Sequence, residues 1–325
     1  MKTTLSRRRF LEVSSAVAWA AGANPLSIGA LARAPARGPY RGALCFFSKP
    51  VPQLNWQELA QSARRAGFMG IELTVRGGGH VLPDRAVEDL PKAVEALRAE
   101  GLEVSMITTA LLQAADPSAE AILRTAGQLS IPLMKPGYYH WKGVDARQEL
   151  AEAGEQFRSL VALAQKYGVQ VAYHNHDQYI GWQLWDLAPT MDTLDPKWAG
   201  YYFDLENALI AGASEEWKVG ANLAMPRLKM VGIKDFVWEN SQAHGWVQSG
   251  RPLGQGACHY QEYLKMLAAA GYHGPLSLHV EYALPGVMDD QGVALSRDQC
   301  DATVAAARHD LDILKAMLRE AYEGA

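Results

Sequence analysis

Two histidines, an amide and a carboxylate fall within five positions in the stretch YHNHD, directly after the apolar run GVQVA. Side chains alternate between the two faces of a strand, so His174 and His176 point to one side and Asn175 to the other. The same alternation brings His279 and Glu281 of LHVEY to one side. Imidazole and carboxylate together suit a divalent transition ion such as Mn, Co, Zn or Fe better than an all-oxygen Mg or Ca site. The pattern therefore predicts a metal site with acid–base groups beside it.

Polar side chains also follow most of the other apolar runs. They are Glu72, Arg76 and His80; Lys135 and His140; Asp204, Glu206 and Asn207; and Lys234 and Asp235. Each has a structural alternative. Asp204 alone could cap a following helix, and a carboxylate such as Glu72 could form an ion pair with a nearby lysine or arginine. Because four separate runs offer possible ligands, the pattern favours their convergence around one ion.

One pattern recurs from residue 40 onward: a short apolar run is followed by an amphipathic segment of ten or more residues, often closed by glycine. The eight apolar runs are 42–47, 68–73, 102–107, 131–135, 169–175, 198–204, 228–235 and 274–282. Runs that are apolar at nearly every position are typical of parallel strands covered on both faces. We therefore expect an α/β fold with a single (β/α)8 TIM barrel over residues 40–320. An open doubly wound sheet is the rival, but no G-x-G-x-x-G follows the first run.

In such a barrel, functional side chains collect at the carboxyl ends of the strands. The helix after the sixth strand is expected near residues 214–224. No second domain is expected, because no Pro- or Ser-rich linker interrupts the repeat.

Composition narrows the possible partners. The chain has 325 residues, 49% hydrophobic and 20% charged, with a formal net charge of -4 and no basic stripe. With this charge, we expect no nucleic-acid partner. The three cysteines, Cys45, Cys258 and Cys300, have no C-x-x-C spacing and are expected to be buried thiols.

The N-terminal segment carries a different signal. Ser6-Arg7-Arg8-Arg9-Phe10-Leu11 resembles the S-R-R-x-F-L pattern of twin-arginine export signals, and a broken apolar run ends in a possible A-x-A cleavage site, Ala30 to Ala32. Residues 1–35 are therefore expected to be a signal peptide and linker, with a disordered basic tail as the alternative. The resemblance implies export of the folded protein to the periplasm, with no stable membrane anchor after cleavage.

Residues 40–318 resemble the sugar phosphate isomerase/epimerase superfamily, with its xylose isomerase-like TIM barrel. The motifs that carry the resemblance are GIEL, YHNHD, YFDLEN, IKDF, PLGQG and GPLSLHVEY. In familiar epimerases of that group, glutamate, aspartate, histidine and glutamate on strands five to eight hold a metal ion, and the two glutamates move protons.

This chain departs from that pattern at three of the four positions. His174, Gly232 and His279 stand where glutamate, histidine and glutamate are expected, and only Asp204 is retained by type. Glu281 lies two residues beyond His279. The set resembles a branch with YHNH and H-x-E-Y strand ends, which includes proteins acting on inososes or 3-keto sugars.

From these residues we assign expected roles. The divalent ion is expected at His174 or His176, Asp204 and His279, with Glu281 as an additional candidate ligand. The pattern leaves open which of the two histidines on the fifth run is the ligand. Candidate proton carriers are Glu281, His176, Lys234 and Asp235. Candidate substrate-binding residues are Glu72, Arg76, His80, His140, Trp182 and Trp238.

A divalent ion that holds two sugar oxygens acidifies the neighbouring C–H, and a positioned base can then remove the proton. We therefore expect a metal-dependent isomerase or epimerase acting on a non-phosphorylated sugar or keto-sugar. Alternatives are a lyase or hydratase acting on 3-keto glycosides by β-elimination, and a non-catalytic exported sugar-binding protein. The sequence leaves open whether the chain forms a homo-oligomer.

Overall fold

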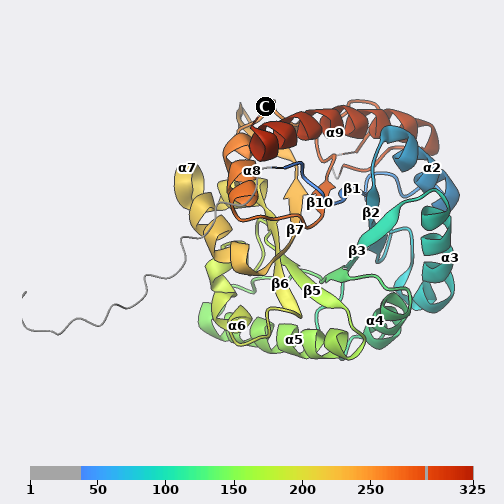
Figure 1. The fold of residues 1–325 in the computed structure, drawn as a ribbon. Helices are drawn as coiled ribbons and strands as arrows, with labels where there is room; N and C mark the ends of the chain where they lie inside the picture. Colours follow the sequence, from blue (N-terminus) through green and yellow to red (C-terminus); the bar gives the residue numbers. More distant parts are fainter. Residues whose placement is uncertain (1–37, 290–291, 325) are drawn as a thin grey trace, which may run out of the picture. The chain divides into compact units, whose positions relative to one another are not determined.

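The computed structural model describes residues 38–289 and 292–324, so the predicted export signal lies outside the described residues. Eight parallel strands close into a barrel, which confirms the predicted fold (Figure 1). They are β1 (Leu44–Phe47), β2 (Gly70–Val75), β3 (Glu103–Thr109), β4 (Leu133–Lys135), β5 (Gln170–His174), β6 (Ala199–Asp204), β7 (Leu228–Ile233) and β10 (Leu276–Leu278).

Helices surround the strands and alternate with them along the chain (Figure 1). They are α2 (Trp56–Ala66), α3 (Ala86–Ala99), α4 (Ala119–Gln128), α5 (Ala146–Lys166), α6 (Ala188–Met191), α7 (Leu205–Ala224), α8 (Tyr260–Ala269) and α9 (Cys300–Glu323). Short 3-10 turns are η1 (Pro83–Arg85), η2 (Leu184–Asp186), η3 (Met225–Arg227) and η4 (Arg297–Gln299). Among the described residues, no helix is both long enough and apolar enough to cross a membrane.

The ends of α2 show how sequence sets these boundaries. Asn55 accepts a hydrogen bond from the backbone N–H of Glu58, and the Glu58 side chain accepts one from the backbone N–H of Asn55. This reciprocal capping box satisfies two backbone donors that the helix itself cannot pair. At the other end Gly67 adopts φ 94°, a left-handed conformation that costs glycine little.

Two apolar clusters hold the barrel together. The larger one lies between the strands and the helices. The smaller one takes one side chain from each of six different strands: Cys45, Met106, Leu133, Ala172, Tyr202 and Met230. Because its members come from around the ring and are separate from the outer core, they fill the barrel interior. The cluster therefore forms a packed floor beneath the carboxyl ends of the strands.

Two elements differ from the sequence expectation. Residues after β7 form an antiparallel hairpin, β8 (Asp235–Ser241) and β9 (Gly245–Arg251), where only a loop was expected. The helix expected near residues 214–224 begins much earlier, at Leu205, because Asp204 ends β6 and caps α7 at once. A single side chain thus makes the strand-to-helix turn without a loop.

Candidate functional site

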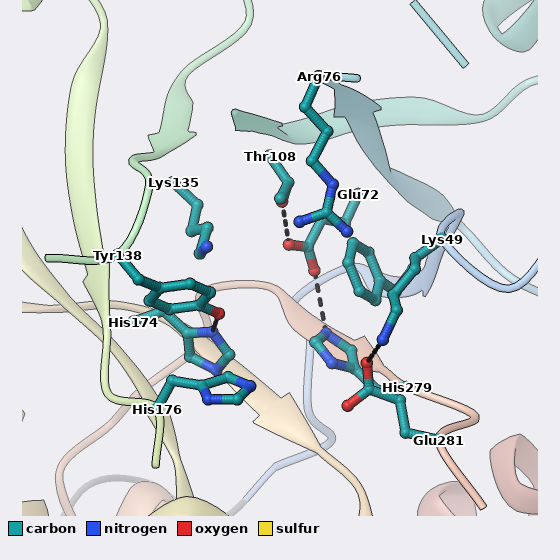
Figure 2. A pocket seen from close by; sticks show the side chains of 11 residues that line it. Lys49, Glu72, Arg76, Thr108, Lys135, Tyr138, His174, His176, His279 and Glu281 are labelled. Carbon is teal, nitrogen blue, oxygen red and sulfur yellow. Dashed lines mark hydrogen bonds and ion pairs between the residues drawn. The ribbon is translucent and has the colours of Figure 1, made fainter. Parts of the chain in front are cut away.

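A cavity of about 90 Å³ opens at the carboxyl ends of the strands (Figure 2). Its wall is almost entirely polar or aromatic, and every lining residue lies near the end of a strand or just beyond it. The lining residues are Phe47, Lys49, Glu72, Arg76, Thr108, Lys135, Tyr138, His174, His176, His279 and Glu281. The predicted convergence of chemically active side chains at one rim is therefore present in the structure.

Glu72 lies at the bottom of the cavity, with its carboxylate held by four donors. The hydroxyls of Thr108, Ser277 and Tyr202 donate to it, and His279 Nε2 lies 3.2 Å from Oε2. Burial raises the pKa of Glu72, but the His279 contact and the hydroxyl donors outweigh burial and lower the pKa to about 2. Because its oxygens are occupied by these donors and the residue is only 1% exposed, Glu72 is a fixed negative charge that is closed off from a substrate.

Glu281 stands on the wall formed by the end of β10, between two ammonium groups. Lys49 Nζ lies 2.7 Å from Oε1, and Lys234 Nζ lies 3.3 Å from Oε2. Burial raises the pKa of Glu281, but the charges of Lys234 and Lys49 outweigh it and hold the pKa well below its usual range. The side chain is 21% exposed, so this carboxylate is both charged and accessible from the cavity.

Lys234 is buried among three carboxylates. Its Nζ lies 3.5 Å from Asp204, 3.6 Å from Glu206 and 3.3 Å from Glu281. Burial lowers the pKa of Lys234, but these neighbours outweigh it and raise the pKa well above its usual value. For Glu206, burial and the surrounding carboxylates outweigh the charge of Lys234 and raise its pKa to about 8. Lys234 is therefore a permanent cation that holds the acidic groups together.

A hydrogen-bonded chain links the wall of β4 to that of β6. The Tyr138 hydroxyl lies 2.8 Å from His174 Nδ1, and His174 Nε2 lies 3.2 Å from Asp204 Oδ2. Burial lowers the pKa of His174 to about 4, although Asp204 opposes this effect. The other oxygen of Asp204 accepts the backbone N–H of Asn207, which is the helix cap considered from sequence. Asp204 thus caps α7 with one oxygen and contacts His174 in the site with the other.

The fifth strand settles which histidine reaches Asp204. Asn175 points away from the cavity, as its position in the strand predicts, and pairs with the backbone of Asp204. His174 approaches the Asp204 carboxylate, whereas His176 sits at the mouth with Nδ1 2.7 Å from Asp177 Oδ1. His174 is therefore the better candidate ligand of the two.

The predicted ion fits part of this arrangement. His174 Nε2 and Asp204 Oδ2 are 3.2 Å apart, a separation compatible with two bonds of about 2.1 Å to one ion. The ring of His279 is turned to Glu72 and Tyr202 instead, and Gly232 offers no ligand. No group of three histidine, cysteine or carboxylate side chains arranged for a metal occurs within the described residues. The full predicted ligand set stays a prediction.

Other predicted residues lie away from the cavity wall. Asp235 accepts backbone N–H groups of Gly254, Gly256 and Cys258, which ties down the loop after β9. Both of its carboxylate oxygens are taken by backbone N–H groups, which argues against the predicted proton-transfer role. Its carboxylate is occupied because it follows β7 by two residues and points out of the barrel ring.

The four loop residues proposed as sugar contacts also lie elsewhere. His80 packs onto Thr74, His140 pairs with Tyr179, and the Trp182 indole donates to a backbone carbonyl. Trp238 is on the β8–β9 hairpin and is 46% exposed. These residues follow the strands by several positions, where strand alternation no longer fixes the direction of a side chain.

Five lining residues were not among the predicted site residues: Phe47, Lys49, Thr108, Lys135 and Tyr138. Lys135 is the last residue of β4; its position at a strand end was noted from the sequence, but no role was assigned to it. Thr108 and Phe47 lie near or at strand ends too, but their types are common in barrel interiors. Lys49 could be found only from its contact with Glu281, 232 positions away.

The sequence matches the family described as Xylose isomerase-like TIM barrel over residues 60–316. The chain belongs to this family. Three solved structures illustrate the likeness: D-allulose 3-epimerase from Methylomonas sp. (17% identity, 86% of this chain and 99% of that chain, TM-score 0.61), 3-keto-D-glucoside 4-epimerase from E. coli (14%, 85% and 100%, 0.61), and a Mycobacterium smegmatis member of the fold in complex with magnesium (17%, 81% and 89%, 0.58). At these identities the likeness shows the fold alone. No curated protein matches the chain.

Proposed function

We propose that the protein is a sugar isomerase or epimerase that moves a proton next to the carbonyl of a non-phosphorylated sugar or keto-sugar. The observation that carries the proposal is Glu281, a charged carboxylate that faces a polar cavity at the functional rim of the barrel. Two similar structures are named as epimerases of a ketose and a keto-glucoside, which supports the same reaction class.

The cavity residues fit the demands of proton abstraction beside a carbonyl. Glu281 removes the proton, while Lys49 and Lys234 keep its carboxylate deprotonated and aimed at the cavity. Arg76, just beyond β2, lines the same cavity and supplies a positive charge that stabilises a developing enediolate oxygen. The ring of Phe47, which stacks on His279 and lines the cavity, offers an apolar surface on which the C–H groups of a sugar can pack.

A divalent ion of the Mn, Co, Zn or Fe type belongs to this proposal, with His174 and Asp204 as its holders. When bound, such an ion polarises the substrate carbonyl and makes the neighbouring C–H more acidic. In the tautomer with its proton on Nδ1, His174 would donate to the Tyr138 hydroxyl, and the lone pair of Nε2, beside Asp204 Oδ2, could bind the ion.

A β-eliminating lyase or hydratase on 3-keto glycosides is the second candidate. His176 favours it, because its ring lines the mouth of the cavity, is 29% exposed and could protonate a leaving oxygen. Elimination begins with the same proton removal by Glu281, so the two reactions separate only at the second step.

Solvent-deuterium incorporation tests the proposal. The purified protein is incubated in D2O with D-allulose, with D-fructose, and with a 3-keto-D-glucoside, with each divalent ion in turn. We expect mass gain at a carbon beside the carbonyl of at least one sugar. Release of the aglycone from the keto-glucoside would identify the lyase. Sugar binding that raises the melting temperature without any deuterium uptake would instead identify a non-catalytic binder and overturn the proposal.

We also propose that the protein is exported by the twin-arginine route to the periplasm, on the basis of Ser6 to Leu11. An exported enzyme would meet free sugars and glycosides rather than sugar phosphates, which supports the non-phosphorylated substrate. Replacing both Arg7 and Arg8 by lysine should leave the protein in the cytoplasmic fraction, and unchanged export would contradict the proposal.

A further inference from the structure

Lys135 is a buried lysine of the cavity wall that the proposed reaction has not yet used. It is the last residue of β4, is only 3% exposed, and lines the cavity. Its Nζ lies 3.3 Å from the centre of the Tyr138 ring. Within the described part of the chain, the ammonium groups of Lys49 and Lys234 have carboxylate partners, whereas Lys135 Nζ has neither a hydrogen bond nor an ion pair.

The surroundings of Lys135 make its proton easy to lose. Burial and the positive charge of Arg76 hold the pKa of Lys135 well below its usual value, although the charges of Glu72 and Glu281 oppose them. Lysines desolvated beside another cation can act as bases or proton carriers at neutral pH. Lys234, with its raised pKa, lacks this property.

The barrel places Lys135 across the cavity from Glu281. The strands follow each other around the ring in the order β1-β10-β7-β6-β5-β4-β3-β2. In this ring β4 and β10 are four strands apart in both directions, which makes their walls opposite. Figure 2 shows Lys135 and Glu281 entering the cavity from these two sides. A sugar held between them presents one face to each group.

We propose that Lys135 is the second proton carrier of the site, so that the protein inverts a carbon beside the substrate carbonyl as a two-group epimerase. This inference rests on the proposed function and narrows it to epimerisation. Glu281 takes the proton from one face of the carbon, and the C–H electron pair moves into the enediolate. The ammonium form of Lys135 gives a proton to the other face, which leaves Glu281 protonated and Lys135 neutral. The other epimer reacts with the enzyme in this form: neutral Lys135 removes the proton and protonated Glu281 donates one to the opposite face.

Other groups near the cavity fit this role less well. Tyr138 bonds to His174 Nδ1 through its hydroxyl, and burial raises the pKa of Tyr138 well above its usual value. His176 projects from β5, adjacent to β4 in the barrel order, but sits at the mouth beside Asp177. Lys135 is therefore the enclosed group best opposed to Glu281.

Exchange measured from each epimer separately tests the inference. The probes are D-allulose with its C3 epimer D-fructose, and a 3-keto-D-glucoside with its C4 epimer, all in D2O. For Lys135→Met we expect inversion to fall by at least about 100-fold. Deuterium uptake should continue from the epimer whose C–H faces Glu281 and fail from the other. Lys135→Arg keeps the charge but does not release its proton at neutral pH, so it should show the same loss as Lys135→Met. It serves as the test variant if Lys135→Met does not fold.

Lys229→Met is the matched control, because Lys229 lies on a barrel strand but at the opposite end, where its Nζ bonds to Gln170. It should invert sugars as the unmodified protein does. Three results would overturn this inference but not the proposed function. They are inversion at the unmodified rate in Lys135→Met, equal loss of exchange from both epimers in that variant, and isomerisation without inversion in the unmodified protein. Absence of exchange from every probe in the unmodified protein would overturn the proposed function as well.

Discussion

Glu72 and Glu281 are carboxylates of one cavity, yet their partners and exposure give them different tasks. Glu72 is buried and accepts hydrogen bonds from neutral hydroxyls and from His279, deep in the barrel. Glu281 is held in its charged form by Lys49 and Lys234 at the wall and is 21% exposed. The Glu72 carboxylate is therefore closed off by its donors, whereas that of Glu281 can reach a substrate. The two residues therefore predict separable effects on stability and on turnover.

Replacing Glu281 with glutamine should lower the rate of sugar inversion by about 10²- to 10⁴-fold, the usual contribution of a positioned base. The amide keeps the shape of the side chain but cannot accept the proton. Steady-state kinetics and a thermal melt measure the two consequences. Glu95→Gln, on the exposed side of α3, is the control. If Glu281→Gln folds normally and its turnover number is unchanged, Glu281 is not the base.

Glu72 should stabilise the protein in a pH-dependent way. Its folded pKa is about 2, below the usual 4.5, so its contribution is complete above pH 4.5 and is lost as the pH falls towards 2. The shift corresponds to a free energy of unfolding on the order of 3 kcal/mol near neutral pH. Denaturant melts of the protein and of Glu72→Gln should therefore differ at pH 7 and converge towards pH 2. A difference independent of pH would contradict the assignment.

Among the elements, the β8–β9 hairpin and the loop behind it depend on Asp235. Three backbone N–H groups of residues 254–258 share its carboxylate. The residue lies beside Lys234 in sequence, so its type and position suggested chemistry. The structure instead shows a loop anchor, because consecutive residues point to opposite sides of a strand end.

Asp235→Asn should consequently weaken the fold more than the reaction. Asparagine retains one acceptor oxygen, and a backbone donor left unpaired costs about 1–3 kcal/mol. We expect the melting temperature to fall by several degrees while the turnover number stays within about threefold. A loss of turnover as large as that of Glu281→Gln with an unchanged melt would restore Asp235 to the proton-carrier set.

Elements differ in how far sequence predicts them. All eight barrel strands were predicted, because apolar β-rich runs alternate with amphipathic segments. The hairpin was missed because DFVWENS and GWVQSGR mix exposed aromatic and polar side chains, and only the first two residues of β8 are buried. The start of α7 was missed because LENALIAGA is apolar or small at most positions and shows little amphipathic periodicity.

For the whole molecule, the barrel fold determines where side chains meet, but not how each one turns. Residues within strands, such as Glu72 and His174, reach the cavity as alternation predicts. Residues in the following loops, such as His80 and His140, do not, because loop direction depends on contacts distant in sequence. The contact between Lys49 and Glu281 could not be predicted from the sequence either, because only the pairing of β1 with β10, which closes the barrel, brings the two residues together.

The stability of the entire barrel offers the last test of the predicted ion. An ion that binds only the folded state raises the melting temperature, and the increase grows with the logarithm of the ion concentration relative to its Kd. Mn, Co or Zn should therefore stabilise the protein by a few degrees more than Mg, because imidazole is a poor Mg ligand. Asp204→Asn should abolish the increase while still capping α7, since asparagine is a good cap. Asp84→Asn, on the exposed η1 turn, is the control. An equal increase in Asp204→Asn would place the ion elsewhere.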